Sequence, residues 1–284
     1  MPYNIVVLAK QVPDTKAVTA KAMKDDGTVN RQALPAIFNP DDLYALELGL
    51  TLKDSYGGRV TVITMGPPQA AEILRESLYR GADKVVLVTD RRAAASDTLA
   101  TSYILSCAVR AAAPFDLVIC GRQAIDGDTA QVGPQLAEKL GLPQMTYVES
   151  VESVSGGKIT ARRNTDYGAE VVEGPLPMLL TITDKAKPPR YPAMKRVMQF
   201  KKATTAAAAA AAGKTPPDDH LLIDEWNLDH IKADVDRCGQ KGSPTNVKRI
   251  QAIVLTGSSY KQIKPNQEGV EGLIHELIED HTIG

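Results

Sequence analysis

The stretch from Cys120 to Pro134 carries the residue types best suited to bind a phosphate-bearing ligand. It reads Cys-Gly-Arg-Gln-Ala-Ile-Asp-Gly-Asp-Thr-Ala-Gln-Val-Gly-Pro and lies between a short aliphatic run and a helical pattern. Parallel α/β sheets bind ligands at such strand-to-helix connections. Small residues let a phosphate approach the backbone, and Thr129 is suited to cap the next helix, whose first N–H groups attract anions. The pattern favours nucleotide binding over an ordinary connection in which the Asp and Thr side chains only cap.

The acidic side chains of this stretch need a different role. Asp126 and Asp128 would repel a phosphate placed directly on them, so we expect them to bond ribose hydroxyls or to organise the loop. A second polar stretch begins a predicted helix at Asp97. Thr98 and Thr101, three residues apart, share one face of that helix. Taken alone, this stretch is typical of a helix start in which Asp97 caps and the threonines satisfy backbone carbonyls.

Standard catalytic and metal-binding patterns are absent from the sequence. It contains neither GxGxxG nor GxxxxGK[ST], so it has neither a standard dinucleotide fingerprint nor a P-loop. The histidines lie near the C-terminal end, with a spacing unsuited to a helical zinc pair; they are His220, His230, His275 and His281. A Ser-His-Asp centre would need this end of the chain to fold back onto the first part. We therefore expect no metal site, and hydrolase chemistry is not favoured.

The order of elements predicts an α/β fold. Short aliphatic runs, typical of strands buried on both faces, alternate with stretches of helical periodicity. The expected strands are 5–8, 60–64, 84–88 and 117–120, and the expected helices are 41–52, 69–79, 97–111 and 131–140. This alternation implies right-handed crossovers in a mostly parallel sheet with helices on both faces, a Rossmann-like architecture of the adenine-nucleotide-binding type.

After residue 144 the alternation of predicted strands and helices ends. Segments 145–153, 158–163, 168–172 and 178–183 follow one another with only turns between them, which predicts an antiparallel addition to the sheet. A basic helix is expected at 194–202, followed by the alanine tract 206–212, which buries little by itself, and by a last helix at 269–278. We divide the chain into an α/β nucleotide-binding domain, residues 1–202, and an alanine-rich linker with an extended C-terminal arm, residues 203–284.

The composition excludes several classes of protein. The chain has 284 residues, of which 43% are hydrophobic and 24% charged, and its formal net charge is −1. This balance gives no overall attraction to nucleic acid or anionic lipid. No apolar run approaches the about 18 residues that a membrane span needs, so no membrane insertion is expected. Cys107, Cys120 and Cys238 show no CxxC spacing, which favours a reducing, cytoplasmic compartment.

Short motifs along nearly the whole chain resemble, in order and spacing, the β subunit of the electron-transferring flavoproteins. They are Ala9–Asp14, Asn39–Asp42, Thr64–Pro68, the pattern Ala161-x-Arg163-x-x-Asp166-x-Gly168-x-Glu170-x-Val172 with Pro177–Thr181, and Lys241–Thr245. Tyr167 departs from the family pattern, in which a small or acidic residue is more usual at this place.

The resemblance implies a heterodimer with an α subunit that carries one FAD. In ordinary members the β-subunit site holds AMP in a structural role, whereas in the electron-bifurcating branch it holds a second FAD. In that branch NADH delivers a hydride to the β-site flavin. One electron then passes to ferredoxin or flavodoxin, and the other passes through the α-subunit FAD to a flavin-dependent dehydrogenase. Because the cofactor carries this chemistry, the resemblance implies no catalytic acid–base residue.

Two stretches, 126–134 and 96–101, resemble the bifurcating branch, in which Thr98 and Thr101 would reach the N5/O4 edge of FAD and tune its electronics. The cofactor-binding residues that the resemblance implies are Ala9, Asn39, Asp41, Thr64, Gly66, Asp97, Thr98, Thr101, Gly121, Gln123, Ala124, Asp126, Gly127, Asp128, Thr129, Ala130, Gln131, Val132 and Gly133.

The resemblance also implies a docking segment at residues 184–202 for the dehydrogenase. Met194 would be its apolar anchor, with Arg190, Lys195 and Arg196 as a basic rim. From the bare residues, a solvated basic helix with one buried methionine is equally compatible. The arm after residue 212 is implied to pack on the α subunit.

Three functions remain open from the sequence. The first is a redox subunit with FAD in the β site and NADH as substrate. The second is a binding subunit that holds AMP structurally and docks dehydrogenases. The third is a small stress-type nucleotide-binding protein without flavin. Thr98, Thr101 and residues 126–134 favour the first over the second, while the docking segment and the long C-terminal region argue against the third.

Overall fold

A computed structural model describes residues 2–14, 34–215, 218–245 and 262–279. Its centre is a nine-stranded sheet in the order β11-β5-β4-β1-β6-β10-β7-β8-β9. The strands are β1 (Tyr3–Leu8), β4 (Gly58–Met65), β5 (Lys84–Val88), β6 (Leu117–Gly121), β7 (Gln144–Ser155), β8 (Lys158–Thr165), β9 (Gly168–Pro175), β10 (Met178–Ile182) and β11 (Asp224–Trp226). The α-helices are α1 (Pro40–Tyr56), α2 (Ala71–Arg80), α3 (Thr98–Ala111), α4 (Val132–Leu140), α5 (Met194–Phe200), α6 (Ala206–Ala211) and α7 (Gln267–Glu279). A separate two-stranded sheet pairs β2 (Gln11–Pro13) with β3 (Ala36–Phe38).

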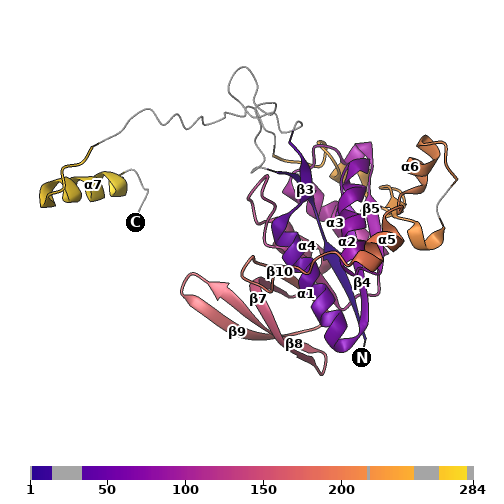
Figure 1. The fold of residues 1–284 in the computed structure, drawn as a ribbon, viewed down its shortest axis with the longest axis horizontal. Helices are drawn as coiled ribbons and strands as arrows, with labels where there is room; N and C mark the ends of the chain where they lie inside the picture. The colour runs from indigo at the N-terminus through magenta and orange to yellow at the C-terminus, as the bar shows by residue number, and fades with distance from the viewer. Residues whose placement is uncertain (1, 15–33, 216–217, 246–261, 280–284) are drawn as a thin grey trace, which may run out of the picture.

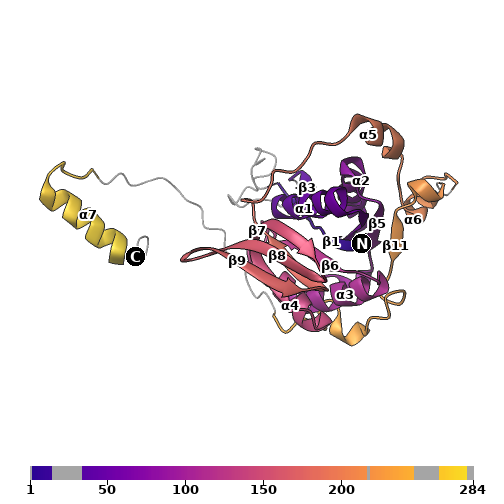
Figure 2. The same cartoon turned by 90° about the horizontal axis from the view of Figure 1, so that it is seen from below.

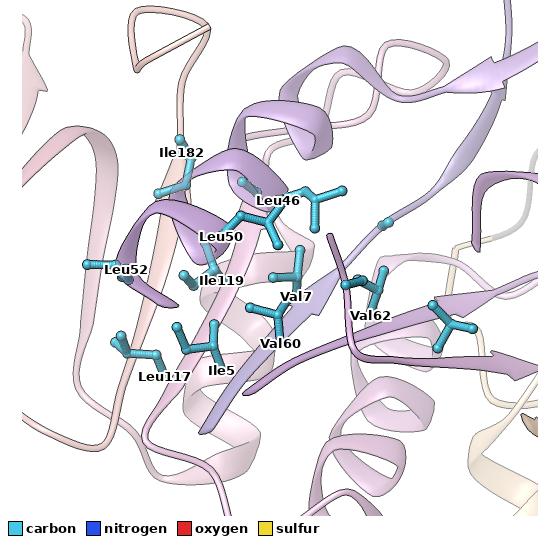
Figure 3. Close-up of a cluster of buried hydrophobic side chains, with 14 of the residues drawn as sticks. Ile5, Val7, Leu46, Leu50, Leu52, Val60, Val62, Leu117, Ile119 and Ile182 are labelled. Carbon is cyan, nitrogen blue, oxygen red and sulfur yellow. The ribbon is translucent and has the colours of Figure 1, made fainter. Parts of the chain in front are cut away.

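The central strand β1 shows why helices cover both faces of the sheet. Alternate residues of a strand point to opposite faces. Ile5 and Val7 pack in the apolar cluster beneath α1 and α2, whereas Val6 and Leu8 pack in the cluster beneath α3 and α4. Figure 3 shows the first of these clusters, with Leu46 of α1 lying over the strands. Figures 1 and 2 show the helices on either side of the sheet.

The predicted parallel arrangement is confirmed. β1 pairs in parallel with β4 and β6, and β4 pairs in parallel with β5. The four helices expected in the first half of the chain are α1, α2, α3 and α4, within a few residues of the expected bounds. Both faces of these strands are apolar because each face is covered by helices.

The predicted antiparallel addition is correct for three of its four segments and wrong for the fourth. β7, β8 and β9 form an antiparallel unit. β10, however, lies between β6 and β7 and is parallel to both. All five residues of β10 are buried, as they must be in a strand with neighbours on both sides and helices on both faces. The short connection from β9 suggested a hairpin, but the unbroken apolar run is typical of a central parallel strand.

Part of the expected C-terminal arm lies on the α/β body. β11 pairs in parallel with β5 and extends the sheet at one edge. Trp226, Leu228, Ile231 and Cys238 belong to the same buried cluster as α3 and α4. The alanine tract, expected to be a linker, contains the short helix α6, whose N-cap Thr205 accepts a hydrogen bond from the backbone of Ala208. The last expected helix is α7, which buries no residue and stands apart from the body in Figure 1.

No helix among the described residues is long and apolar enough to cross a membrane.

Candidate functional site

A cavity of about 430 Å³ opens at the carboxyl ends of β1, β4 and β6. Most residues predicted to bind a cofactor line it; apart from Ala9, which follows β1, they come from two stretches that are distant in the sequence. These lining residues are Ala9, Asp97, Thr98, Thr101, Gly121, Gln123, Ala124, Gly127, Asp128, Thr129, Ala130, Gln131, Val132 and Gly133. The two stretches meet because each follows the carboxyl end of a parallel strand, β5 or β6.

Two glycines allow helices to come close to the end of the sheet. A Cβ atom on Gly121 would lie 2.5 Å from Oδ1 of Asp42 and 2.7 Å from the backbone carbonyl carbon of Asp41. A Cβ on Gly133 would lie 2.7 Å from Cγ2 of Thr181. A side chain at either position would therefore push α1 or α4 away from the strands. Gly127 differs, because a Cβ there would meet nothing within 4 Å.

Asn39 lies outside the cavity lining and holds the loop that forms it. Its side chain is fully buried; Nδ2 donates to the carbonyl of Gln123 at 2.8 Å, and Oδ1 accepts from the backbone N–H of Ile125 at 3.2 Å. The side chain makes no capping hydrogen bond to α1. Asn39 is therefore a positioning residue for the loop at residues 123–125.

Asp42, which sequence reasoning missed, lines the cavity. Its Oδ2 accepts from the backbone N–H of Lys10 at 2.8 Å, and its Oδ1 accepts from the N–H of Gly121 at 2.9 Å. Burial raises the pKa of this carboxyl to about 7, although both N–H groups favour the charged form. The sequence feature that could have indicated this role is the position of Asp42 in the first turn of the predicted helix, directly after the predicted site residue Asp41.

Asp41 faces Arg122 instead of the cavity. Its Oδ2 lies 3.4 Å from Nε of Arg122, and burial raises the pKa of Asp41 despite this cation. Neither of these two atoms has a hydrogen-bond partner, although both are buried. Arg122 lines the cavity. A guanidinium that lines a cavity beside a loop of small residues suits an anionic ligand.

Of the two acids in the loop, Asp128 lines the cavity and Asp126 does not. Oδ1 of Asp126 lies 2.7 Å from Nζ of Lys10, a cavity-lining residue that sequence reasoning also missed. The charge of Asp126 is therefore compensated. Asp128 accepts from Nε2 of Gln123 at 2.9 Å and has a positive φ of 48°. Both acids organise the loop, which is one of the two roles predicted for them.

The start of α3 forms the second wall of the cavity. Asp97 caps the helix, since its Oδ1 accepts from the N–H of Ala100 at 3.0 Å. Burial acts to raise the pKa of Asp97, but hydrogen bonds from backbone N–H groups outweigh it and hold that pKa below its usual value. The backbone of Asp97 also donates to Oγ of Ser243 at 2.8 Å. Thr98 donates to Oε1 of Gln131 at 2.9 Å, which ties this wall to the loop.

Thr64 and Gly66 lie near the cavity but do not line it. Thr64 is fully buried in β4, and its hydroxyl has no hydrogen-bond partner. Gly66 donates its backbone N–H to the carbonyl of Val88 at 3.0 Å. These two predicted residues therefore support the carboxyl ends of the strands and do not line the cavity.

The expected docking segment is held to the body by two of its predicted rim residues. Nε of Arg190 lies 2.7 Å from Oε2 of Glu47, which is almost fully buried, and Arg190 also reaches Asp54. Arg196 donates to the carbonyls of Leu78 and Ala82, both at 2.6 Å. These two arginines are therefore occupied within the chain.

The apolar surface of this segment is exposed. Met194 is 74% exposed, and Tyr191 and Met198, which sequence reasoning did not single out, are 91% and 58% exposed. Lys195 is exposed as well. The sequence left open whether Met194 is an apolar anchor or the buried methionine of a solvated helix. Its exposure rules out the buried methionine. Met194 and Met198 lie about one turn apart on α5, and Tyr191 precedes this helix, so exposed apolar side chains occur in it and beside it.

The fold defines a Rossmann-like α/β protein, and its cavity lies at the carboxyl ends of the parallel strands. Comparison with known proteins identifies its family. The family model of the electron transfer flavoprotein domain matches residues 26–217, and the chain belongs to this family.

Curated relatives of nearly equal length agree with this assignment. The electron transfer flavoprotein subunit beta of Clostridium acetobutylicum is 43% identical over 281 residues, which cover 99% of this chain and all of the relative. The acryloyl-CoA reductase electron transfer subunit gamma of Anaerotignum propionicum is 41% identical over 284 residues, with 99% and 100% covered. Subunit CarD of the caffeyl-CoA reductase-Etf complex of Acetobacterium woodii is 40% identical over 282 residues, with the same coverage. The chain is thus a β-type subunit of its family.

We predict that Gly121→Ala weakens the site, whereas Gly127→Ala does not. The new methyl at position 121 would meet the backbone of α1, which costs about 1–3 kcal/mol of unfolding free energy. We also expect less nucleotide to be released from the purified protein on denaturation. Urea unfolding and chromatography of the released nucleotide measure both effects. Equal losses in the two variants would contradict the role assigned to the close approach at Gly121.

A second prediction concerns the pH dependence of stability. Because burial raises the pKa of Asp42 to about 7, the folded protein binds a proton that the unfolded chain releases above its ordinary carboxyl pKa. The contribution of Asp42 to stability therefore falls as pH rises from about 4 to 7. Asp42→Asn removes this dependence, so its stability deficit relative to wild type should shrink over that range. A deficit that stays constant from pH 4 to 7 would show that Asp42 is ionised throughout.

Proposed function

We propose that this chain is the β subunit of an electron-bifurcating electron transfer flavoprotein, with FAD in the cavity and NADH as the hydride donor. The observation that carries the proposal is the extent of the cavity. It reaches from the loop at 121–133 across to the start of α3, past the apolar side chains of Leu8, Met65 and Leu105. A phosphate-binding loop joined to an apolar compartment suits a nucleotide that carries a flat ring system.

The chain's own residues would bind and orient this cofactor. FAD supplies the hydride acceptance and one-electron transfer when bound. The backbone N–H groups at the start of α4 and the guanidinium of Arg122 suit its phosphates. The hydroxyl of Thr98 is already bonded to Gln131, whereas the hydroxyl of Thr101, which also lines the cavity, has no hydrogen-bond partner among the described residues. Thr101 is therefore the better donor for the ring edge of the flavin.

The proposed partners are an α subunit that carries a second FAD, a flavin-dependent dehydrogenase, and ferredoxin or flavodoxin as the low-potential acceptor. The names of two relatives, which mention acryloyl-CoA reductase and caffeyl-CoA reductase, support a dehydrogenase of the acyl-CoA type. The exposed Tyr191, Met194 and Met198 are the proposed contact with it. Because residues 224–238 of the C-terminal arm pack on this chain's own body, only the exposed helix α7 is proposed to pack on the α subunit. Three free, buried cysteines support a cytoplasmic location.

A second candidate function is a β subunit that holds AMP structurally and docks dehydrogenases without accepting a hydride. One observation favours it. Thr98, expected at the edge of a flavin ring, uses its hydroxyl to bind Gln131. In this alternative the wall formed by α3 would face solvent instead of a cofactor.

The cofactor content of the heterodimer decides between these functions. This chain is co-purified with its α subunit, the complex is denatured, and FAD and AMP are quantified by chromatography. We expect two FAD and no AMP per heterodimer, together with NADH-dependent reduction of ferredoxin. One FAD with one AMP would reject the bifurcating function and leave the structural alternative.

The docking segment gives an independent prediction. Met194→Asp places a charge at the centre of an apolar contact, so kcat/KM for electron transfer to the dehydrogenase should fall by about 100-fold or more. NADH oxidation with a small artificial acceptor should be unchanged. Tyr167→Asp, at the exposed turn between β8 and β9, is the matched control. Loss of both activities in Met194→Asp would mean that the substitution disturbs the cofactor site instead.

A further inference from the structure

A second cavity, also of about 430 Å³, lies on the outer side of the first turns of α3. Three parts of the chain form it: α3, the end of α4 and the segment at 236–244. The side chains that define it are Leu99, Tyr103, Lys139, Asp236, Arg237 and Lys241, and we call this surface the α3 outer face. Figure 2 shows the chain after β11 running back past α3.

The α3 outer face is cationic. Lys139, Arg237 and Lys241 contribute three positive charges, and Asp236 contributes one negative charge, which is paired with Lys241 at 2.7 Å. Neither Lys139 nor Arg237 forms an ion pair within the described part of the chain. Arg110 adjoins the face, since its guanidinium donates to the carbonyl of Lys139. The chain as a whole has a net charge of −1, so this concentration of cations is local.

The face also has a rigid apolar centre. The guanidinium carbon of Arg237 lies 3.9 Å from the ring centroid of Tyr103, whose hydroxyl accepts from the backbone N–H of Asp234 at 2.8 Å. These contacts hold the Arg237 charge in place. Leu99 beside them is 42% exposed. A small apolar patch bordered mainly by cations is the arrangement of a transient docking surface, in which the charges speed encounter.

This face and the proposed cofactor cavity lie on two sides of the first turn of α3. Leu99 lies on the face, whereas its neighbour Thr98 lines the cofactor cavity. Ser243 lies on the face as well, and its Oγ accepts from the backbone of Asp97, another residue of the cofactor cavity. An α-helix is about 10 Å across, so a protein seated on this face would lie close to a cofactor in the cavity.

We propose that the α3 outer face is the docking surface for an acidic one-electron carrier protein. This inference rests on the proposed function and names the surface at which the low-potential electron leaves. NADH supplies two electrons and a proton as hydride and becomes NAD⁺. One electron would reduce the carrier and the other the FAD of the α subunit. The proton would be released to solvent. A carrier with a negative surface complements the cations of the face.

The test uses the intact heterodimer with a bacterial two-cluster ferredoxin as the carrier. Lys139→Glu, Lys241→Glu and the double variant are compared with Lys158→Glu, an exposed lysine on β8 that makes the same charge change far along the sheet. NADH-dependent ferredoxin reduction is measured over a range of NaCl concentrations. We expect KM for ferredoxin to rise about tenfold in the double variant at low salt, with kcat unchanged and a weaker dependence on salt. Reduction of a small neutral acceptor and the Lys158→Glu variant should match wild type.

Several results would overturn the proposal. One is an unchanged KM for ferredoxin in the double variant, when the wild-type complex is active. Another is a rise in KM for NADH instead, which would assign the face to the dinucleotide. Failure of the double variant to form the heterodimer would assign it to the α subunit. If a wild-type complex with two bound FAD reduces no ferredoxin, the proposed function itself fails.

Discussion

The carboxylate of Asp42 joins three parts of the chain on which the site depends. Its two oxygens accept the N–H groups of Lys10, after β1, and of Gly121, at the end of β6. These bonds require α1 to lie against the strand ends, and the absence of a side chain at Gly121 makes this approach possible. Burial raises the pKa of Asp42 because few water molecules can reach this junction. The loop that lines the cavity then starts from a fixed point, and Asn39 fixes it again a few residues further on.

The same helix supports a second surface. α1 begins at the cavity with Asp42 and continues to Glu47, whose buried carboxylate receives both the side chain and the backbone N–H of Arg190. Burial acts to raise the pKa of Glu47, but the bonds from Arg190 outweigh it and lower that pKa. The exposed Met194 follows Arg190 closely in the chain. A displacement of α1 would therefore move the floor of the cavity and the support of the exposed segment together.

The sequence predicted those features that depend on neighbouring residues. Aliphatic runs such as Ile5–Leu8 located the parallel strands, and the connections after β5 and β6, which the family resemblance assigned to one site, line one cavity. Features that depend on distant partners were not predictable. The helical phase that turns Asp42 to the cavity, and Asp41 to Arg122, is set by the close approach at Gly121. The place of β10 depends on the crossover that inserts it beside β6.

The two edges of the nine-stranded sheet differ in how they meet solvent. At one edge β11 has only three residues and ends at Trp226, which lies against the body. At the other edge β9 carries Glu170 and Glu173, whose carboxylates face Arg163 and Lys158 of β8. Charged and very short edge strands discourage further strands from pairing with them. The backbone of this sheet thus resists accidental fibre-like association, and an open sheet of this width can persist without closing into a barrel.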